Sequence, residues 1–118
     1  WGNSNPSCNL ANFINCVDGT SPVGSYPAGA SPYGAMDMVG NVWEWVADWW
    51  DNDYYQNSPQ NNPSGPIEPK PSNNFIMRGA AWTRPSWRLK VFHRSGSLRG
   101  TAGQNSDNDS GFRCVIAP

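Results

Sequence analysis

Apolar and polar residues alternate most clearly in the middle of the chain, directly after the Gly40-Asn41 turn. One face of this stretch carries Trp43, Trp45, Ala47 and Trp49, and the other carries Val42, Glu44, Val46 and Asp48. Alternation with a period of two predicts a β-strand. A helix would stack Trp45 over Trp49 and leave Trp43 outside that stripe. We therefore predict a strand that begins at Val42.

Shorter apolar runs predict three further strands, at residues 75–82, 89–94 and 111–116. Residues 1–34 are crowded with turn dipeptides such as Asp18-Gly19 and Ser21-Pro22, which exclude helix over most of that stretch. Residues 51–74 are polar and rich in proline and asparagine, so we expect an excursion over the surface. Residues 95–110 are rich in Gly, Ser and Asn and predict a loop.

Composition adds aromatic mass to this turn-rich pattern. The 118 residues include 7 Trp, 12 Gly and 11 Pro. Gly and Pro favour turns, whereas the large tryptophan rings supply the burial that disordered chains lack. We therefore expect a loop-rich fold with a dense aromatic core.

The charge of the chain argues against nucleic-acid binding. The net charge is -1, only 14% of residues are charged, and no run of Lys and Arg occurs. Tight binding to a phosphate backbone requires a basic patch. No apolar stretch approaches the roughly 20 residues that span a bilayer.

The three cysteines leave two interpretations open. Cys8 and Cys16 bracket a short turn segment and can pair, or all three thiols, Cys114 included, can be reduced. If the first two pair, Cys114 is either free or bonded outside these residues. Neither a CxxC motif nor a Cys/His cluster is present, so zinc is not expected.

Four segments, in order, resemble the sulfatase-modifying-factor or formylglycine-generating-enzyme superfamily. They are Trp1-Gly2-Asn3, the stretch 31–45 (SPYGAMDMVGNVWEW), Arg78-Gly79-Ala80-Ala81-Trp82 and Gly111-Phe112-Arg113-Cys114. The resemblance implies an α+β fold similar to that of C-type lectins, loop-rich with short antiparallel strands. The motifs belong to the later part of the family domain, and the chain begins at Trp1. We therefore expect residues 1–118 to be the C-terminal portion of one domain whose N-terminal part is missing.

The resemblance also implies calcium. In the family's pattern Asp37 and Glu44 offer side-chain oxygens, while Gly40 and Val42 offer backbone carbonyls, and calcium takes 6–8 oxygen ligands of these kinds. The alternative is that Glu44 pairs with an arginine, Arg78 or Arg113. A second family site carries over to Asn12, Phe13 and Asp18.

Catalysis by the family's copper mechanism is not expected. The two cysteines that bind copper in the enzymes correspond to Arg84 and Leu89, so the soft thiolate ligands that Cu(I) requires are missing. An enzyme role would then need catalytic groups outside this chain.

The resemblance extends to variable proteins of diversity-generating retroelements, in which this fold displays a hypervariable face before the closing Gly-Phe-Arg. That segment corresponds to residues 83–109, and the expected contact residues are Arg84, Trp87, His93 and Arg99. Trp and Arg are enriched at binding hot spots, although Trp87 and Phe92 can equally be core residues.

We therefore expect a non-catalytic, calcium-stabilised module that binds a protein or glycan ligand. A component of an enzyme and a sugar-binding lectin-like domain remain alternatives; Glu68-Pro69-Lys70 faintly resembles a lectin sugar motif. A secreted or surface-displayed bacterial location is favoured over a cytoplasmic one.

Overall fold

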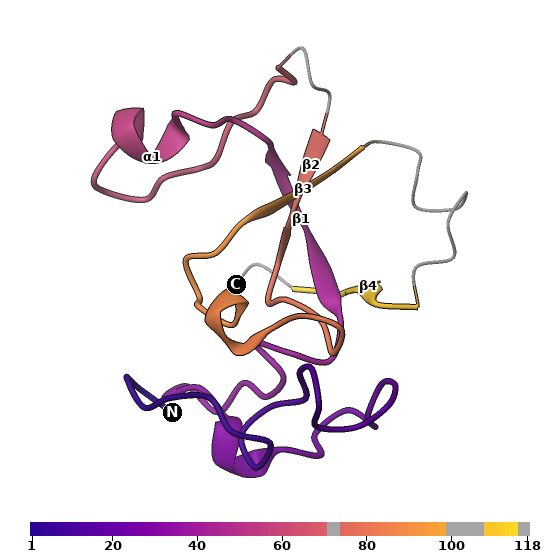
Figure 1. Cartoon of the computed structure of the whole chain (residues 1–118). Helices are drawn as coiled ribbons and strands as arrows, with labels where there is room; N and C mark the ends of the chain where they lie inside the picture. Colours follow the sequence, from indigo (N-terminus) through magenta and orange to yellow (C-terminus); the bar gives the residue numbers. More distant parts are fainter. Residues whose placement is uncertain (71–73, 99–107, 116–118) are drawn as a thin grey trace.

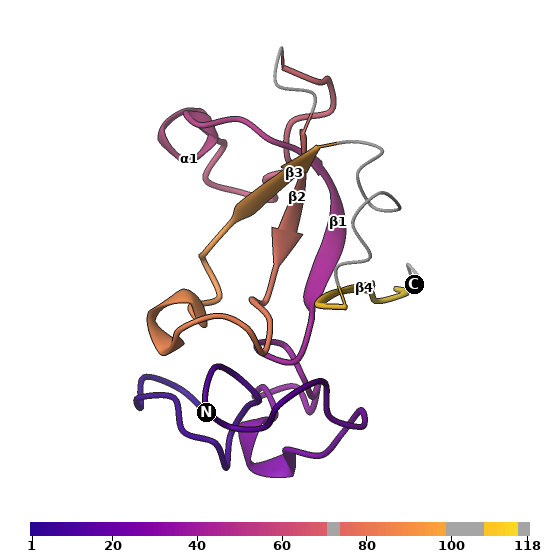
Figure 2. The ribbon, with the colours of Figure 1, turned by 45° about the vertical axis from the view of Figure 1, so that its right-hand side comes forward.

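The computed structural model of the chain describes residues 1–70, 74–98 and 108–115. A four-stranded sheet with the order β3-β2-β1-β4 lies at its centre (Figures 1 and 2). The strands are β1 (Trp43–Trp49), β2 (Asn74–Arg78), β3 (Ser95–Leu98) and β4 (Ser110–Phe112). One helical turn, α1 (Tyr54–Asn57), and two 3-10 turns, η1 (Pro27–Gly29) and η2 (Ser86–Arg88), complete the regular elements of the described part.

The strand predicted to begin at Val42 is confirmed as β1, which begins one residue later and lies inside the sheet. It pairs antiparallel with β2, where Glu44 faces Arg78, and parallel with β4, where Glu44 faces Gly111. The sheet is therefore mixed: the expected antiparallel pairing joins β1, β2 and β3, and β4 adds a parallel strand. The register shifts between Trp45 and Trp49, and both rings pack on Phe75.

The other three predicted strands differ from the observed ones. The strand expected at 75–82 ends at Arg78, because Gly79 and Ala80 have φ values of 88° and 61°, outside the β region. The strand expected at 89–94 is absent, and the predicted 95–110 loop contains β3. The strand expected at 111–116 begins one residue earlier and ends at Phe112; residue 116 lies outside the described residues.

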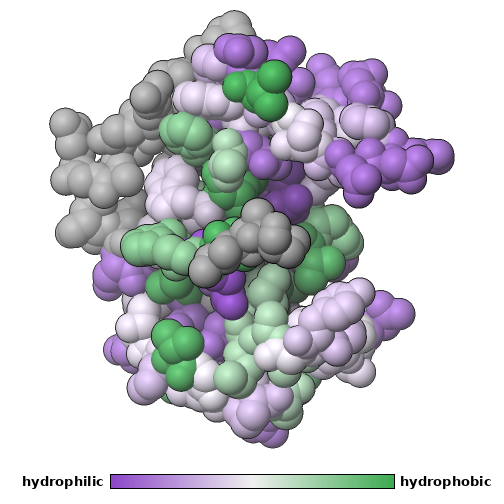
Figure 3. All heavy atoms as spheres, turned by 180° about the vertical axis from the view of Figure 1, so that it is seen from behind, coloured by the Kyte–Doolittle hydropathy of each residue, from purple (hydrophilic) through white to green (hydrophobic). Residues whose placement is uncertain are grey.

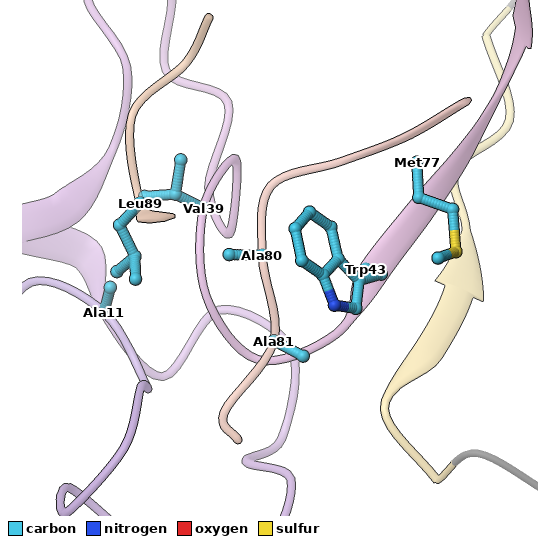
Figure 4. Close-up of a cluster of buried hydrophobic side chains, with 7 residues drawn as sticks. All are labelled: Ala11, Val39, Trp43, Met77, Ala80, Ala81 and Leu89. Carbon is cyan, nitrogen blue, oxygen red and sulfur yellow. The ribbon is translucent and has the colours of Figure 1, made fainter. Parts of the chain in front are cut away.

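The buried core is smaller and less aromatic than the composition predicted. Only Trp43 among the tryptophans is fully buried, at 2% exposure. It belongs to one cluster with small and aliphatic side chains from the N-terminal turns, the turn before β1, β2 and the loop that follows β2 (Figure 4). These are Ala11, Val39, Met77, Ala80, Ala81 and Leu89. Leu89 is buried at the end of η2, so this 3-10 turn is anchored to the core through a single leucine.

Asn41 joins three turn segments at the start of β1. Its backbone N–H donates to the carbonyl of Asn12 at 2.8 Å, and its carbonyl accepts from the N–H of Trp82 at 2.9 Å. Its side chain exchanges two hydrogen bonds with the backbone of Ser21, at 2.8 and 3.0 Å. Asn41 itself is in the left-handed region at φ 65°. The irregular half of the chain is thereby tied to the sheet.

Cys8 and Cys16 form a disulfide, with their Cα atoms 5.3 Å apart, while Cys114 is free and exposed. The first of the two interpretations left open by the sequence is therefore the observed one. In the part of the chain that the structure describes, no helix is long and apolar enough to cross a membrane.

Gly40 is required by close backbone approach. Its N–H donates to the carbonyl of Gly79 at 2.7 Å. A Cβ at Gly40 would lie 2.5 Å from the carbonyl oxygen of Asn12, and the residue has φ +81°. Gly34 has almost the same φ, +80°, but a Cβ there would have no atom within 4 Å.

These two glycines give a matched test of the approach at Gly40. Gly34→Ala should lower the free energy of unfolding by about 1–2 kcal/mol, the cost of a left-handed alanine. Gly40→Ala should cost about 1–3 kcal/mol more, because the methyl group must also displace the Asn12 carbonyl. Urea unfolding of both variants measures the difference. Equal losses would show that φ alone, and not the close approach, requires glycine at position 40.

Candidate functional site

The predicted calcium turn is occupied by an arginine. The Nε of Arg113 donates to both carboxylate oxygens of Glu44, at 3.0 and 3.2 Å, and its Nη2 donates to Glu44 Oε1 at 2.7 Å. The same Nη2 donates to the carbonyl oxygen of Asp37 at 3.1 Å. The hydrogen bond with Glu44 raises the pKa of Arg113 above its ordinary value, and the nearby charges of Glu44 and Asp37 add to this effect. The arginine alternative for Glu44 is thus the arrangement observed.

The other predicted calcium ligands of this turn, Asp37 and Val42, already have neighbours within the chain. The Asp37 carboxylate accepts the N–H of Gly24 at 2.7 Å. The carbonyl of Val42 faces Gly79, 3.8 Å from the position a Cβ would take there. The donor atoms are hard oxygens of the kind calcium prefers. However, Arg113 already supplies positive charge to Glu44, so a cation bound at Glu44 would have to share this carboxylate with the guanidinium.

The second predicted metal site contains an unpaired buried oxygen. Asn12 is 1% exposed, and its Nδ2 donates to the carbonyl of Gly19 at 2.9 Å, which brings it to the turn that holds Asp18. The Oδ1 of Asn12 is buried and has no hydrogen-bond partner. Phe13 directs its carbonyl to the N–H of Cys16 at 3.0 Å. An orphaned amide oxygen in this family pattern fits a calcium ligand, since buried acceptors are otherwise paired.

Arg84 and Leu89, which stand where the family enzymes have cysteines, are used structurally. The Nη2 of Arg84 lies 3.4 Å from Asp109 Oδ2, which also accepts the hydroxyl of Thr83 at 2.8 Å. Leu89 belongs to the core. Asp109, which sequence analysis missed, is itself buried and accepts the N–H of Trp43 through its carbonyl at 2.7 Å. It fixes the start of β4 beside β1.

Aromatic, aliphatic and cationic side chains, most of them exposed, lie on both sides of Leu89 in the sequence. We call this set the 87–92 surface; it consists of Trp87, Arg88, Lys90, Val91 and Phe92. Trp87, Val91 and Phe92 are 58%, 78% and 63% exposed. The core alternative for Trp87 and Phe92 is therefore excluded. Exposed apolar residues are also visible among hydrophilic ones in Figure 3, which shows the face opposite to that of Figure 1.

The backbone of the 87–92 surface is held from beneath by Arg78 and Tyr55. The Nη1 of Arg78 lies 3.2 and 3.3 Å from the carbonyls of Val91 and His93, and 3.0 Å from the hydroxyl of Tyr55. Tyr55 in turn donates this hydroxyl to the carbonyl of Phe92 at 3.0 Å. The segment can therefore keep one shape without a strand, and its side chains are left to face outward.

The predicted contact residue His93 is less exposed than Trp87 and Phe92. His93 is half-buried, with its ring 6.1 Å from the rings of both Trp43 and Trp87, and its Nε2 is buried without a partner. Burial first, and then the positive charges of Arg88 and Arg78, hold the pKa of His93 below its usual 6.5. His93 is thus a neutral residue under Trp87. Arg99 lies outside the described residues.

A cleft of about 560 Å³ lies beside the disulfide, lined by residues 14–18, Trp82 and Thr83. The N–H of Ile14 donates to the carbonyl of Arg84 at 3.1 Å, so one wall of the cleft is bonded to the segment that leads to the 87–92 surface. Sequence analysis did not identify this cleft, because it forms between segments nearly 70 residues apart. Its members carry no shared motif.

Known proteins are similar to this chain in both sequence and fold. The sulfatase-modifying factor enzyme 1-like domain matches residues 4–118. Serine/threonine-protein kinase pkn1 of Chlamydia caviae is 38% identical over 107 residues, 89% of this chain and 16% of the kinase. PvdO of Pseudomonas aeruginosa superposes with a TM-score of 0.74 at 31% identity, over 94% of this chain and 40% of PvdO. Treponema denticola variable protein 1 has a TM-score of 0.67 at 27% identity, over 88% and 34%.

These likenesses confirm the expected formylglycine-generating-enzyme-like, C-type-lectin-like fold and the expected similarity to a variable protein. They also show that the chain spans 16% of the length of the curated kinase relative and less than half of either solved relative.

The neutral His93 predicts how stability depends on pH. Its folded pKa is lower than the unfolded value of about 6.5, so the unfolded chain binds the proton first. Stability should be constant above that value and fall as the pH drops from about 6.5 through the folded pKa, by at most about 1.4 kcal/mol per pH unit. Urea unfolding between pH 7.5 and 5.5 measures this loss. Because His93 is the single histidine, His93→Gln should remove it; a slope that persists in this variant would refute the assignment.

Proposed function

The chain belongs to the sulfatase-modifying factor enzyme 1-like domain family, and from that premise we propose that it is a non-catalytic binding module whose contact site is the 87–92 surface. The observation that supports this most is the exposure of Trp87 and Phe92 on a segment fixed by other residues. Contiguous exposed apolar patches commonly mark interaction sites. Trp is among the residues that most often dominate binding energy.

The positions of the scaffold residues support the same conclusion. Leu89 anchors the segment in the core, and Arg78 bonds its carbonyls, so neither needs the exposed side chains. Binding residues are typically displayed in this way, on loops positioned by a rigid frame. The likeness to a variable protein agrees with such a display.

The absence of copper chemistry is supported by residue identity. Arg84 and Leu89 cannot act as thiolate ligands, and both are already used, one in an ion pair and the other in the core. Cys8 and Cys16 are bonded to each other, and Cys114 is a single exposed thiol. The alternative, a component of an enzyme whose catalytic groups lie elsewhere, is favoured by the likeness to a protein kinase, of which this chain matches a minor part.

A sugar-binding role has less support. Within the Glu68-Pro69-Lys70 motif, the ammonium group of Lys70 lies 3.5 Å from the carboxylate of Asp51, and Glu68 is exposed.

Calcium is proposed as a stabilising ligand of the turn half of the molecule. The unpaired Oδ1 of Asn12, with the carbonyl of Phe13 and the carboxylate of Asp18, would hold it at one site. Asp37, Gly40, Val42 and Glu44 would hold it at the other, where Glu44 is shared with Arg113. A bound cation would supply positive charge that ties these turns together.

Binding through the 87–92 surface predicts that Trp87→Ala loses its partners while the fold survives. With the immobilised chain as bait, the amount of each captured protein, quantified by mass spectrometry, should fall at least tenfold. Circular dichroism should be unchanged, since the core does not include Trp87. Ile67→Ala, at a position that is exposed like Trp87 but lies outside this surface, is the matched control and should bind normally. Equal losses in both variants, or unfolding of Trp87→Ala, would refute the proposal.

Calcium binding predicts a higher melting temperature in calcium than in chelator. At a calcium concentration about 100 times the dissociation constant, the gain in stability should be about 2.7 kcal/mol per site. Asp18→Asn should remove the gain at the Asn12 site, and Glu44→Gln the gain at the Asp37–Glu44 turn. Asp53→Asn makes the same charge change at an exposed position and should respond like the unmodified chain. A melting temperature indifferent to calcium in the unmodified chain would leave both sites without support.

A further inference from the structure

The 87–92 surface carries positive charge that nothing in the described part of the chain neutralises. The ion pairs among the described residues involve other cations: Lys70 with Asp51, Arg84 with Asp109 and Arg113 with Glu44. The cations on or beside the 87–92 surface pair with no carboxylate among the described residues. They are Arg78, Arg88, Lys90 and Arg94. Because the whole chain has a net charge of -1, this is a local concentration of positive charge on a slightly acidic molecule.

Cationic and apolar groups are interleaved on this surface. The guanidinium carbon of Arg88 lies 4.8 Å from the centre of the Trp87 ring, and the ammonium nitrogen of Lys90 lies 5.6 Å from the centre of the Phe92 ring. Contacts of this kind hold a cation against a ring while its remaining N–H groups stay free to donate. Val91, between Lys90 and Phe92 in the sequence, is also exposed. The surface therefore offers fixed positive donors next to apolar area.

The two arginines that bond to backbone carbonyls beside this surface, Arg78 and Arg94, are not neutralised by a carboxylate among the described residues. Arg78 donates through Nη1 to the carbonyls of Val91 and His93, and Arg94 donates through Nη1 to the carbonyl of Asp51 at 3.1 Å. Both thus remain charged without meeting a carboxylate. Their charges add to those of Arg88 and Lys90, which make no side-chain hydrogen bond within the described residues.

We propose that the 87–92 surface binds an acidic segment of another polypeptide, in which carboxylate side chains alternate with apolar ones. This inference rests on the proposed function and names the class of partner. The carboxylates would meet Arg88 and Lys90, and the apolar side chains would cover Trp87, Val91 and Phe92. A nucleic acid fits less well, because a cation already lies over one face of each ring and the chain has no run of Lys and Arg to follow a phosphate backbone.

The probe for this proposal is a seven-residue peptide of alternating Glu and Leu, compared with the same peptide carrying Gln in place of Glu. Fluorescence anisotropy should show at least tenfold tighter binding of the Glu peptide, with the difference shrinking between 50 and 500 mM salt, as expected for charge complementarity. The double variant R88Q/K90Q should bind the Glu peptide at least tenfold more weakly and the Gln peptide unchanged. K70Q, a lysine outside this surface, is the matched control and should bind like the unmodified chain.

The other outcomes separate this proposal from the proposed function. Equal binding of both peptides, lost in Trp87→Ala, would overturn the acidic partner and leave the binding surface standing. Binding of neither peptide by a chain that still captures partners through Trp87 would do the same. Oligothymidylate bound as tightly as the Glu peptide would replace the polypeptide with a nucleic acid. Binding of the Glu peptide that is unaffected by both R88Q/K90Q and Trp87→Ala would overturn both proposals. Circular dichroism of R88Q/K90Q guards against a loss caused by unfolding.

Discussion

The hydrogen bonds of Asn41 are the constraint on which the rest of the molecule depends. The first forty residues contain a single 3-10 turn as regular structure and cannot form a ladder of their own. Asn41 connects Asn12, Ser21 and Trp82 through its backbone and side chain. By bonding to several backbone groups at once, a polar residue of this kind pairs groups that would otherwise need the ladder of a sheet. The left-handed backbone at Asn41 is one that asparagine tolerates better than most residues.

The ion pair of Glu44 with Arg113 affects the contacts of Arg78 on the neighbouring strand. Glu44 and Arg78 are direct cross-strand partners, and opposite charges at such positions normally pair. Glu44 instead binds Arg113, which follows β4 on the opposite flank of β1. Arg78 is thereby left available for the carbonyls of residues 91 and 93. The same carboxylate that resembles a metal ligand thus helps to determine how the 87–92 surface is supported.

Local patterns predicted the centre of the fold and missed its edges. The alternating tryptophans identified β1, because one face of a strand is buried and carries the large apolar side chains, here Trp43. The residues of β3, Ser95–Leu98, show no such alternation; this strand forms because β2 offers an unpaired edge, and Gly96 lets the Trp50 ring lie 3.2 Å from where a Cβ would be. The run after Leu89 was mistaken for a strand because Leu89 and Val91 alternate, yet only Leu89 is buried. At the candidate site, the sequence indicated Trp87 and Arg84; Trp87 lies on the 87–92 surface, whereas Arg84 pairs with Asp109. The sequence also offered Arg113 as a partner of Glu44, but the roles of Asp109 and Tyr55 depend on contacts between distant segments.

The way in which the 87–92 segment is held also bears on its evolution. Leu89 reaches the core, Arg78 and Tyr55 bond to main-chain carbonyls, and none of these contacts reads the identity of the outward side chains. Amino-acid replacements at positions 87, 88, 90, 91 and 92 would therefore alter the proposed binding surface at little expense to the stability of the fold. A framework that supports a segment through its backbone separates foldability from specificity, so that selection can act on one without endangering the other.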